Sequence, residues 1–434
     1  MLARPHLHLL LLASLALPLG AQAPTVDLAH RTGRSRYALG RLISVRELAD
    51  GQVVASDSKE GLFRLVDFNH NTVGILGEQG DSAGDYRRAA QMITLPGDSI
   101  GMIDAGSARI MHVSASGGIG PFVPMPRATR RLAQLLGADT SGALYFATLP
   151  ERDSTTHMPS STQWVTRLAG DGQADVPQFA YQNRKSDQPL RGITPFSFAD
   201  AVAVRADGLG ARVVADSYQV IWYRSGHETG RTGLIPYQPI VISAEEQQAI
   251  RDSIVQMFKS ISMSASAGGA RTVSIGSGGS GGSGAPMAVS GGAVAFDRMD
   301  VAMAPASGGT TMTMAAAPAG AAGGASPAVK SAAAAMAGIN AADMIGAFPA
   351  NKPAITSSVN SVIFDNNGML WIARERVRGD LVPHYDVVAE GRGVVAHVNL
   401  PTGTRLIGFG RGVVYLAHLE AGSEYLERYP MPKS

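Results

Sequence analysis

Three aspartates recur at matching places in a repeated pattern and are the strongest candidates for chemistry. Asp57, Asp104 and Asp216 stand at or near the end of the short β-rich runs VVASD, IGMID and RVVADS. Carboxylates at equivalent positions of a closed ring reach the same end of it, where they could bind a cation or a basic ligand. The alternative is that each aspartate caps the following turn by accepting backbone N–H bonds, as aspartate does in turns generally.

Arginines accompany these aspartates on neighbouring runs. Arg109 and Arg374 are therefore candidate ligand-binding residues, and their alternative role is an ion pair with an aspartate or a place on the solvated surface. No convergent set of a nucleophile and a base is visible, so the catalytic residues, if there are any, stay unknown. The string Gly278–Gly282 fits the G-x-S-x-G nucleophile elbow only by letters, because that elbow needs a strand before it and a helix after it.

The histidines give no sign of a metal site. None of them forms an H-x-H, H-x-x-x-H or H-E-x-x-H set, which are the spacings that place two ligands on one element. By strand position His112, His384 and His397 lie on outer strands, away from any central channel. We therefore predict no metal and no cofactor.

Composition narrows the classes of function. The chain has 434 residues, no cysteine, 37 Lys and Arg against 35 Asp and Glu, and only 17% charged residues. The missing cysteine excludes disulfides, thiolate metal sites and a cysteine nucleophile. The near balance of charge gives no basic footprint for nucleic acid or an anionic membrane.

The elements that must position these residues repeat six times. The copies begin at or near residues 53, 100, 143, 212, 369 and 413. Where nothing intervenes they are about 45 residues apart, and a repeat of this length with four short strands is typical of a propeller blade. In the second copy we expect strands over residues 91–95, 99–104, 108–114 and 122–125. Tryptophans 164, 222 and 371 are expected to fill the space between blades.

The two ends of the chain are expected to close the ring. The sixth copy runs out after three strands, and residues 25–30 form a short extended segment ahead of the first copy. We predict that this N-terminal segment supplies the outer strand of blade six, because closure pairs edges that would otherwise be exposed. The sequence thus predicts an all-β, six-bladed β-propeller.

A resemblance agrees with the repeats. The connector Gly77–Tyr86, GEQGDSAGDY, and the run VADSYQVIWY resemble the connector and core motifs of NHL-repeat proteins. As a whole, the chain is similar to secreted bacterial six-bladed β-propellers of that kind. The resemblance implies that the protein binds a ligand or a protein through loops on one face. Extracellular lyases similar to this fold use a metal held in the channel.

The remaining segments set the domain plan. Residues 1–21 have the order of a secretory signal peptide, so we expect an exported protein, periplasmic or extracellular, with no membrane span. Residues 22–242 are assigned to blades one to four and 352–434 to blades five and six. Between them we predict a helix over 243–259, which begins with a Ser–Glu capping box, and a disordered Gly/Ala/Ser/Met-rich insertion over 260–351.

Three functions stay open at this point. The first is a secreted, non-catalytic propeller that binds an extracytoplasmic protein or a small ligand, and we expect it to be a monomer. The second is a lyase or lactonase-like hydrolase with Ca²⁺ or Zn²⁺ in the axial channel. The third is a cell-envelope scaffold whose insertion contacts the partner. The residues that line the channel would decide between binding and catalysis.

Overall fold

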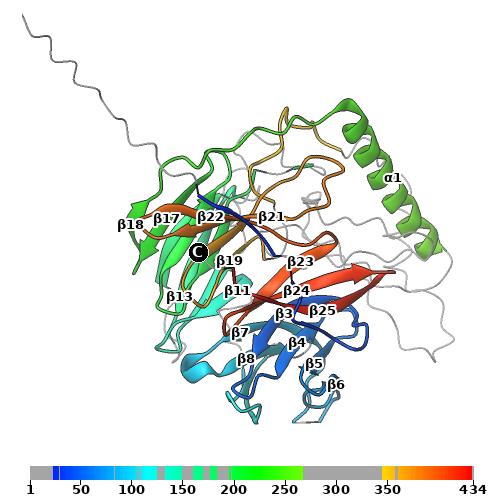
Figure 1. Cartoon of the computed structure of the whole chain (residues 1–434), viewed down its shortest axis with the longest axis vertical. Coiled ribbons are helices and arrows are strands. Elements are labelled where there is room, and N and C mark those ends of the chain that lie inside the picture. The colour runs from blue at the N-terminus through cyan, green and yellow to red at the C-terminus, as the bar shows by residue number, and fades with distance from the viewer. Residues whose placement is uncertain are drawn as a thin grey trace, which may run out of the picture.

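The computed structural model describes residues 23–28, 30–82, 84–104, 107, 109–124, 132–148, 160–169, 176–182, 195–196, 198–266, 345–356 and 360–432. Their strands form six sheets arranged as blades of a ring (Figure 1). The predicted six-bladed β-propeller is therefore confirmed. In each blade the chain runs from the innermost strand outward through antiparallel neighbours.

Blades one to three each hold four consecutive strands. Blade one consists of β3 (Leu42–Glu47), β4 (Val53–Asp57), β5 (Leu62–Asp67) and β6 (Thr72–Ile75). Blade two consists of β7 (Ala89–Thr94), β8 (Ile100–Asp104), β9 (Arg109–Val113) and β10 (Ile119–Pro124), with a 3-10 turn at Pro96–Asp98. Blade three consists of β11 (Leu132–Ala138), β12 (Leu144–Thr148), β13 (Thr162–Leu168) and β14 (Val176–Gln182). The strands expected for the second copy lie within three residues of those in blade two.

Blade four also holds four consecutive strands, whereas blades five and six each include a strand from the N-terminal segment. Blade four consists of β15 (Ala201–Val204), β16 (Gly210–Val214), β17 (Gln219–Arg224) and β18 (His227–Arg231). Blade five consists of β19 (Val362–Phe364), β20 (Leu370–Ala373), β21 (His384–Ala389), β22 (Gly393–Asn399) and β1 (Thr25–Asp27). Blade six consists of β23 (Thr404–Gly410), β24 (Val413–Glu420), β25 (Ser423–Pro430) and β2 (Gly33–Arg34).

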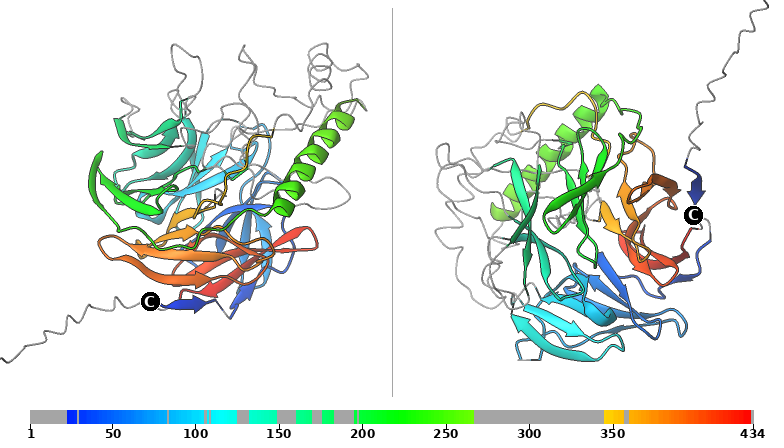
Figure 2. Two further views of the ribbon diagram at one scale, coloured as in Figure 1. Left: turned by 90° about the horizontal axis from the view of Figure 1, so that it is seen from above. Right: turned by 90° about the vertical axis from the view of Figure 1, so that its left-hand side faces the viewer.

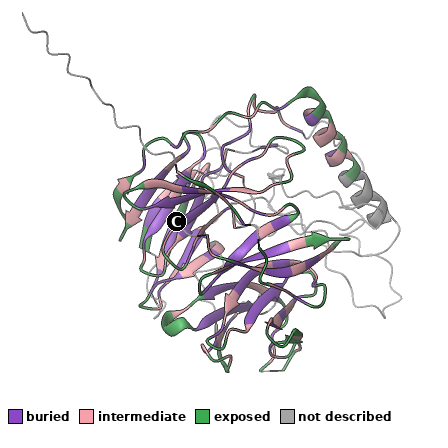
Figure 3. Ribbon diagram, in the orientation of Figure 1, coloured by how far each residue is buried: buried purple, intermediate pink, exposed green. Residues whose placement is uncertain are grey.

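The hydrophobic core is divided among the junctions between blades. Six main clusters of buried apolar residues each join two neighbouring blades, which closes the circle. Between blades five and six, for example, the rings of Trp371 and Phe409 lie 5.1 Å apart. The inner strands are consequently buried on both faces (Figure 3), as in sheets covered on both sides. Trp222 and Trp371 fill such junctions, but Trp164 does not, because it is 41% exposed on β13.

The N-terminal segment closes the ring at blade six. β2 pairs antiparallel with β25, through Gly33 opposite Arg428 and Arg34 opposite Glu427. Farther along, Leu39 and Glu424 exchange two backbone hydrogen bonds before the chain enters β3. Residues 31–39 and their contacts with blade six are called the closure seam below.

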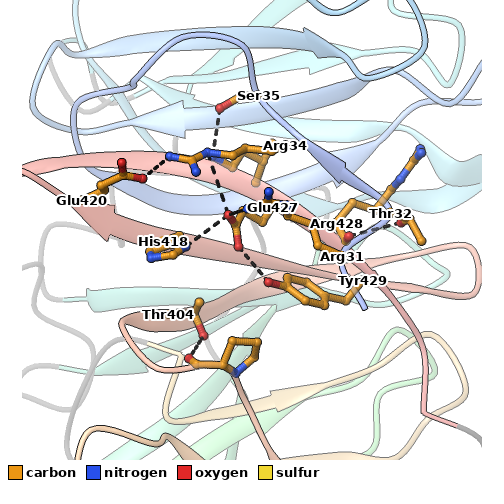
Figure 4. A network of polar contacts seen from close by, with 12 residues as sticks. Arg31, Thr32, Arg34, Ser35, Thr404, His418, Glu420, Glu427, Arg428 and Tyr429 are labelled. Carbon is orange, nitrogen blue, oxygen red and sulfur yellow. Dashed lines mark hydrogen bonds and ion pairs between the residues drawn. The ribbon is translucent and has the colours of Figure 1, made fainter. Parts of the chain in front are cut away.

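Glu427 is the centre of the closure seam (Figure 4). Its carboxylate is fully buried and accepts hydrogen bonds from Arg31, from His418 at 3.1 Å and from the Tyr429 hydroxyl at 2.8 Å. Burial alone would raise the pKa of Glu427, but these hydrogen bonds outweigh it and the pKa is lowered. The carboxylate therefore stabilises the folded ring in its ionised form.

The start of the segment that we predicted to close blade six lies in blade five instead. Residues 25–27 form β1, which pairs in parallel with β22 as a fifth strand of blade five. The pairing of β25 is made by residues 33 and 34 instead. Sequence pattern favoured residues 25–30 because they are extended and apolar, but Gly33 and Arg34 are the residues that the Glu427 network holds in register.

The helix α1 (Ala244–Ser266) lies at the periphery of the ring (Figure 2), and it is longer than the predicted 243–259. Ser243 caps it by accepting the Glu246 amide at 3.1 Å. Ile254 packs against Ile345, with Phe348 beside them. The buried Lys352 fixes the helix by pairing with Glu246 at 2.8 Å and donating to the carbonyl of Arg376.

The insertion predicted over residues 260–351 lies between blades four and five as expected, and its bounds differ from those of the elements on either side. Residues 260–266 belong to α1, and residues 350–352 pair with 240–242, so the chain leaves and re-enters the ring side by side. Composition alone overlooks this, because it does not show that a few apolar residues, namely Ile345 and Phe348, pack against the helix. Residues 267–344 lie outside the described residues, as does the predicted signal peptide. No helix in the described part of the chain is long and apolar enough to cross a membrane.

Candidate functional site

Asp57 and Asp104 occupy the same place in blades one and two. Each ends the second strand and pairs across to the first residue of the inner strand, so both lie at the same end of the ring. Asp57 accepts the amides of Gly40 and Arg41 at 2.8 and 2.9 Å. Asp104 likewise accepts the amides of Arg87 and Arg88. Both carboxylates therefore hold the connector that leads into the inner strand.

A glycine makes this contact possible in blade one. A Cβ atom on residue 40 would lie 2.3 Å from the Asp57 carboxylate oxygen, which is a severe clash. Only glycine allows the backbone to come this close. Asp57 also faces Arg64, with 3.6 Å between the charged atoms, and Asp104 binds Arg109 at 3.0 Å. Burial alone would raise the pKa of Asp104, but its hydrogen bonds outweigh it and the pKa is lowered.

Asp216 is not equivalent to these two aspartates. It is exposed, and the matching role in blade four belongs to Asp200, which accepts the amides of Gln182 and Ala215 and pairs with Arg212. Arg374 lies 3.8 Å from the buried Asp386 of β21. The five predicted residues are thus spread over four blades, and no single cavity gathers them. A ligand-binding role for Asp57, Asp104, Asp216, Arg109 and Arg374 stays a prediction.

The cavity that all six blades share is the axial channel. It has a volume of about 540 Å³ and is lined by the innermost strands β3, β7, β11, β15, β19 and β23. This size is within the range of small-molecule sites. A larger hollow of about 720 Å³ lies by the outer strands of blades five and six. That hollow is open, and its polar groups are already bonded: His384 joins Asn399 and Asp380.

Arg46 is the distinctive residue of the axial channel. It lies on β3 and lines the cavity, and among the described residues no carboxylate pairs with it. Its Nη1 donates to the carbonyl of the adjacent Val45 at 2.7 Å, and its buried Nε has no hydrogen-bond partner. Desolvation lowers the pKa of Arg46 to about 10, so the group is still a cation at neutral pH. A buried charge without a partner destabilises a protein.

Uncommitted amides accompany Arg46 on the same side. Gln91 of β7 and Gln134 of β11 line the axial channel, and neither side chain has a hydrogen-bond partner within the described residues. Ser44 also lines it and accepts the Met92 amide at 3.1 Å. For each of Ser44, Gln91 and Gln134, the next residue along the inner strand pairs with the same place in the second strand, two residues before that strand ends. They are therefore equivalent positions of blades one to three.

Two of the three carboxylates in the described lining of the axial channel, Glu47 and Asp365, are engaged, and the third, Asp98, is exposed in the 3-10 turn after β7. Glu47 binds Arg411 at 3.2 Å and accepts the hydroxyl of Tyr415 at 2.9 Å. Asp365 accepts the amides of Asn367 and Met369 and the indole N–H of Trp371. Among the residues that the structure describes, no three His, Asp or Glu side chains are grouped so that they could hold a metal ion. The described lining therefore does not fit a divalent cation.

The histidines occupy the strands expected for them. His112, His384 and His397 lie on outer strands of their blades and His418 on the second strand of blade six, all outside the lining of the axial channel. Three of them join buried or partly buried carboxylates, as His397 joins Asp386 at 2.6 Å. Those histidines therefore belong to hydrogen-bond networks within blades five and six.

Sequence reasoning overlooked Arg46, Gln91 and Gln134. The signal was present, because each is a lone long polar residue inside an otherwise buried inner strand: LISVRE, AAQMIT and LAQLLGA. The sequence comparison of second strands drew attention to the repeated aspartates instead. Polar residues on the innermost strand have no neighbouring blade to pack against on the axial side, so they are the ones that face the cavity.

Comparison with known proteins adds similarity of shape only. No family model and no curated protein matches the sequence. Among solved structures, a streptogramin B lyase has a TM-score of 0.37 at 10% identity, with 91% of this chain and 96% of that chain covered. Regucalcin, a calcium-binding protein from Agrobacterium tumefaciens, has a TM-score of 0.38 at 10% identity, covering 95% and 97%.

A gluconolactonase from Xanthomonas campestris gives similar values, with a TM-score of 0.38, 10% identity, and 94% and 98% of the two chains covered. Similarity this low carries no information about activity. The assignment of the fold therefore rests on the sheet topology of this chain, which is that of a six-bladed β-propeller.

Proposed function

We propose that this protein is a non-catalytic β-propeller that binds a small molecule in its axial channel. The observation that carries the proposal is Arg46, a cation inside the ring for which the described residues supply no carboxylate partner. Proteins retain such destabilising groups where function needs them. A bound ligand that supplies the missing partner would offset the cost of desolvating Arg46.

The axial channel supports this function better than the loops of one face do. The aspartates at the ends of the second strands accept amides of the connectors, and Asp104 also holds Arg109 in an ion pair. Arg46, Gln91 and Gln134 have hydrogen-bonding groups open. Binding groups that are preorganised and unsatisfied are what a ligand can use.

The metal-dependent enzyme is the second candidate, and the described lining gives it less support. Two of the channel carboxylates, Glu47 and Asp365, already bond to protein groups, which leaves Asp98 as a single oxygen donor residue for a cation that takes several. Arg46 beside them would repel a divalent cation. We derive no catalytic step from this lining.

Filling the axial channel tests the proposed function. Gln91→Trp places a large side chain in the cavity while breaking no hydrogen bond. We expect that compounds found by thermal shift in a mixed panel of neutral and charged small molecules will stabilise the wild type and not this variant. Ile75→Trp, on the exposed outer strand β6, is the control and should behave like the wild type. Equal stabilisation of all three proteins would contradict a channel site.

We also propose that the protein is exported, on the order of charged, apolar and small residues over 1–21. The protein would then be periplasmic or extracellular, and its resemblance to secreted NHL-like propellers would extend to its location. Cell fractionation with N-terminal sequencing tests this, with cleavage expected before Gln22. An intact Met1 in the cytoplasmic fraction would refute it.

A further inference from the structure

The wall of the axial channel is divided into two unlike halves. Blades one to three contribute polar side chains, namely Ser44, Arg46, Gln91 and Gln134. On their inner strands, blades four to six contribute apolar side chains, namely Val202, Val204, Val362, Phe364 and Phe409. Their polar lining residues lie just outside those strands, namely Arg205, Asn360, Asp365, Asn366 and Arg411. A ring of repeated blades would give a uniform wall if the lining served packing alone. The division indicates a ligand that is polar on one side and apolar on the other.

The charges of the lining define what the polar side can accept. Arg205 forms a bidentate pair with Asp207 at 2.7 and 2.8 Å, and Arg411 pairs with Glu47 at 3.2 Å. Arg46 is left as the cation without a counterion among the described lining residues. The charged side chains of the described lining balance, with Arg46, Arg205 and Arg411 against Glu47, Asp98 and Asp365. A ligand with a single negative charge opposite Arg46 disturbs this balance less than a phosphate monoester, which would bring nearly two.

Hydrogen-bond chemistry gives the form of that charge. The guanidinium of Arg46 presents N–H donors in a planar fork that fits a carboxylate. Gln91 and Gln134 each have N–H donors available for further carboxylate or carbonyl oxygens.

We propose that the axial channel binds a small monocarboxylate with an apolar body, the carboxylate at Arg46 and the body along β15, β19 and β23. This proposal rests on the proposed function, because it names the class of ligand for the same cavity. The volume of about 540 Å³ admits a medium-chain or aromatic acid. The preference comes from a charge-assisted hydrogen bond at one side and from burial of apolar surface at the other.

Calorimetry with octanoate and its neutral isostere octanamide tests the charge. We expect the full-length wild type to bind octanoate about ten- to a hundredfold more tightly than octanamide, the range for a hydrogen bond to a charged group. Arg46→Met should weaken octanoate by the same factor and leave octanamide unchanged. Arg46→Lys should restore part of the preference. The control is Arg87→Met, which removes an exposed arginine paired with Asp81 and should change neither affinity.

A chain-length series tests the apolar half. Affinity should rise about fourfold for each methylene from butanoate to octanoate, as for burial of CH₂ groups. Affinity that does not change with length would overturn the assignment of the apolar body.

The outcomes separate this inference from the proposed function. Equal binding of octanoate and octanamide, both abolished by Gln91→Trp, would overturn the carboxylate while the channel site stands. If octanoate does not bind, while another compound of the mixed panel binds the wild type and not Gln91→Trp, the carboxylate assignment is again overturned and the channel site stands. Octanoate binding that Gln91→Trp leaves intact would overturn both.

Discussion

The closure seam and the axial channel both bury a charged side chain, and they treat it in opposite ways. In the closure seam Glu427 is bonded to Arg31, His418 and Tyr429, and those contacts tie the first strands of the chain to the last. In the axial channel Arg46 bonds only to the neighbouring Val45 carbonyl. A satisfied buried charge specifies structure, whereas an unsatisfied one costs stability and is available for binding.

The blades show the same contrast on a smaller scale. Asp104 and Arg109 satisfy each other, and Arg109 also stacks on Phe122 with its guanidinium carbon 4.0 Å from the ring centre. Arg46 has no such neighbour among the described residues. Two arginines in adjacent blades should therefore differ in the sign of their contribution to stability.

The largest expected effect is the loss of the closure seam. Glu427→Ala leaves Arg31, His418 and Tyr429 without their shared acceptor. It should lower the free energy of unfolding by about 3–5 kcal/mol because three hydrogen bonds to a buried carboxylate are lost together, although Arg31 itself is partly exposed. Urea unfolding followed by circular dichroism measures it. Glu420→Ala removes an exposed partner of Arg34 in the same seam and should cost at most about 1 kcal/mol. Similar losses in the two variants would show that Glu427 does not hold the ring.

The pH dependence of that effect has a defined sign. Because the folded pKa of Glu427 lies below its ordinary value of 4.5, its stabilising contribution is present above pH 4.5 and is lost as the pH falls through the folded pKa. The difference in unfolding free energy between the wild type and Glu427→Gln should accordingly narrow on acidification. A difference that widens below pH 4.5 would contradict the network.

A smaller effect separates the two arginines. Arg109→Met leaves the buried Asp104 without its ion-pair partner and should lower the free energy of unfolding by about 2–3 kcal/mol. This is less than the loss for a fully buried ion pair, because Arg109 is partly exposed. Arg46→Met removes an unpartnered cation and should raise it by about 1 kcal/mol, as substitutions at functional sites often do. Urea midpoints at pH 7 give both signs. Destabilisation by Arg46→Met would mean that the group has a structural role.

Much of the fold could be predicted because it depends on the local pattern of residue types along the chain. The six copies, the turns between their strands and the positions of His112 or His397 within blades follow from residue type and spacing alone. The shared position of Asp57 and Asp104 follows as well, but the amides that both accept belong to the connector before the inner strand, whereas the capping alternative placed them on the turn that follows. The placement of Asp216 was wrong, because its run aligns with the others by residue type, while in the structure Asp216 is exposed and Asp200, outside that run, is the buried aspartate that accepts backbone amides.

The ring closure was predictable in kind and not in detail. An unfinished sixth copy indicates that the N-terminus completes it, but whether residues 25–27 or 33–34 pair with β25 depends on contacts made nearly four hundred residues away. The same holds for Trp164, which has the pattern of a buried strand residue and is exposed, and for the helix, whose partners Ile345 and Phe348 follow it by about ninety residues.

The sequence by itself determined the repeat, and with it the number of blades, their order and the excess of glycine at turns. Only the tertiary structure decided which charges are satisfied. The sequence does not distinguish Arg46 from Arg109, because an ion pair depends on which side chains face each other across strands. The β8–β9 hairpin brings Asp104 to Arg109, whereas no carboxylate of the described residues pairs with Arg46, and that difference locates the candidate site.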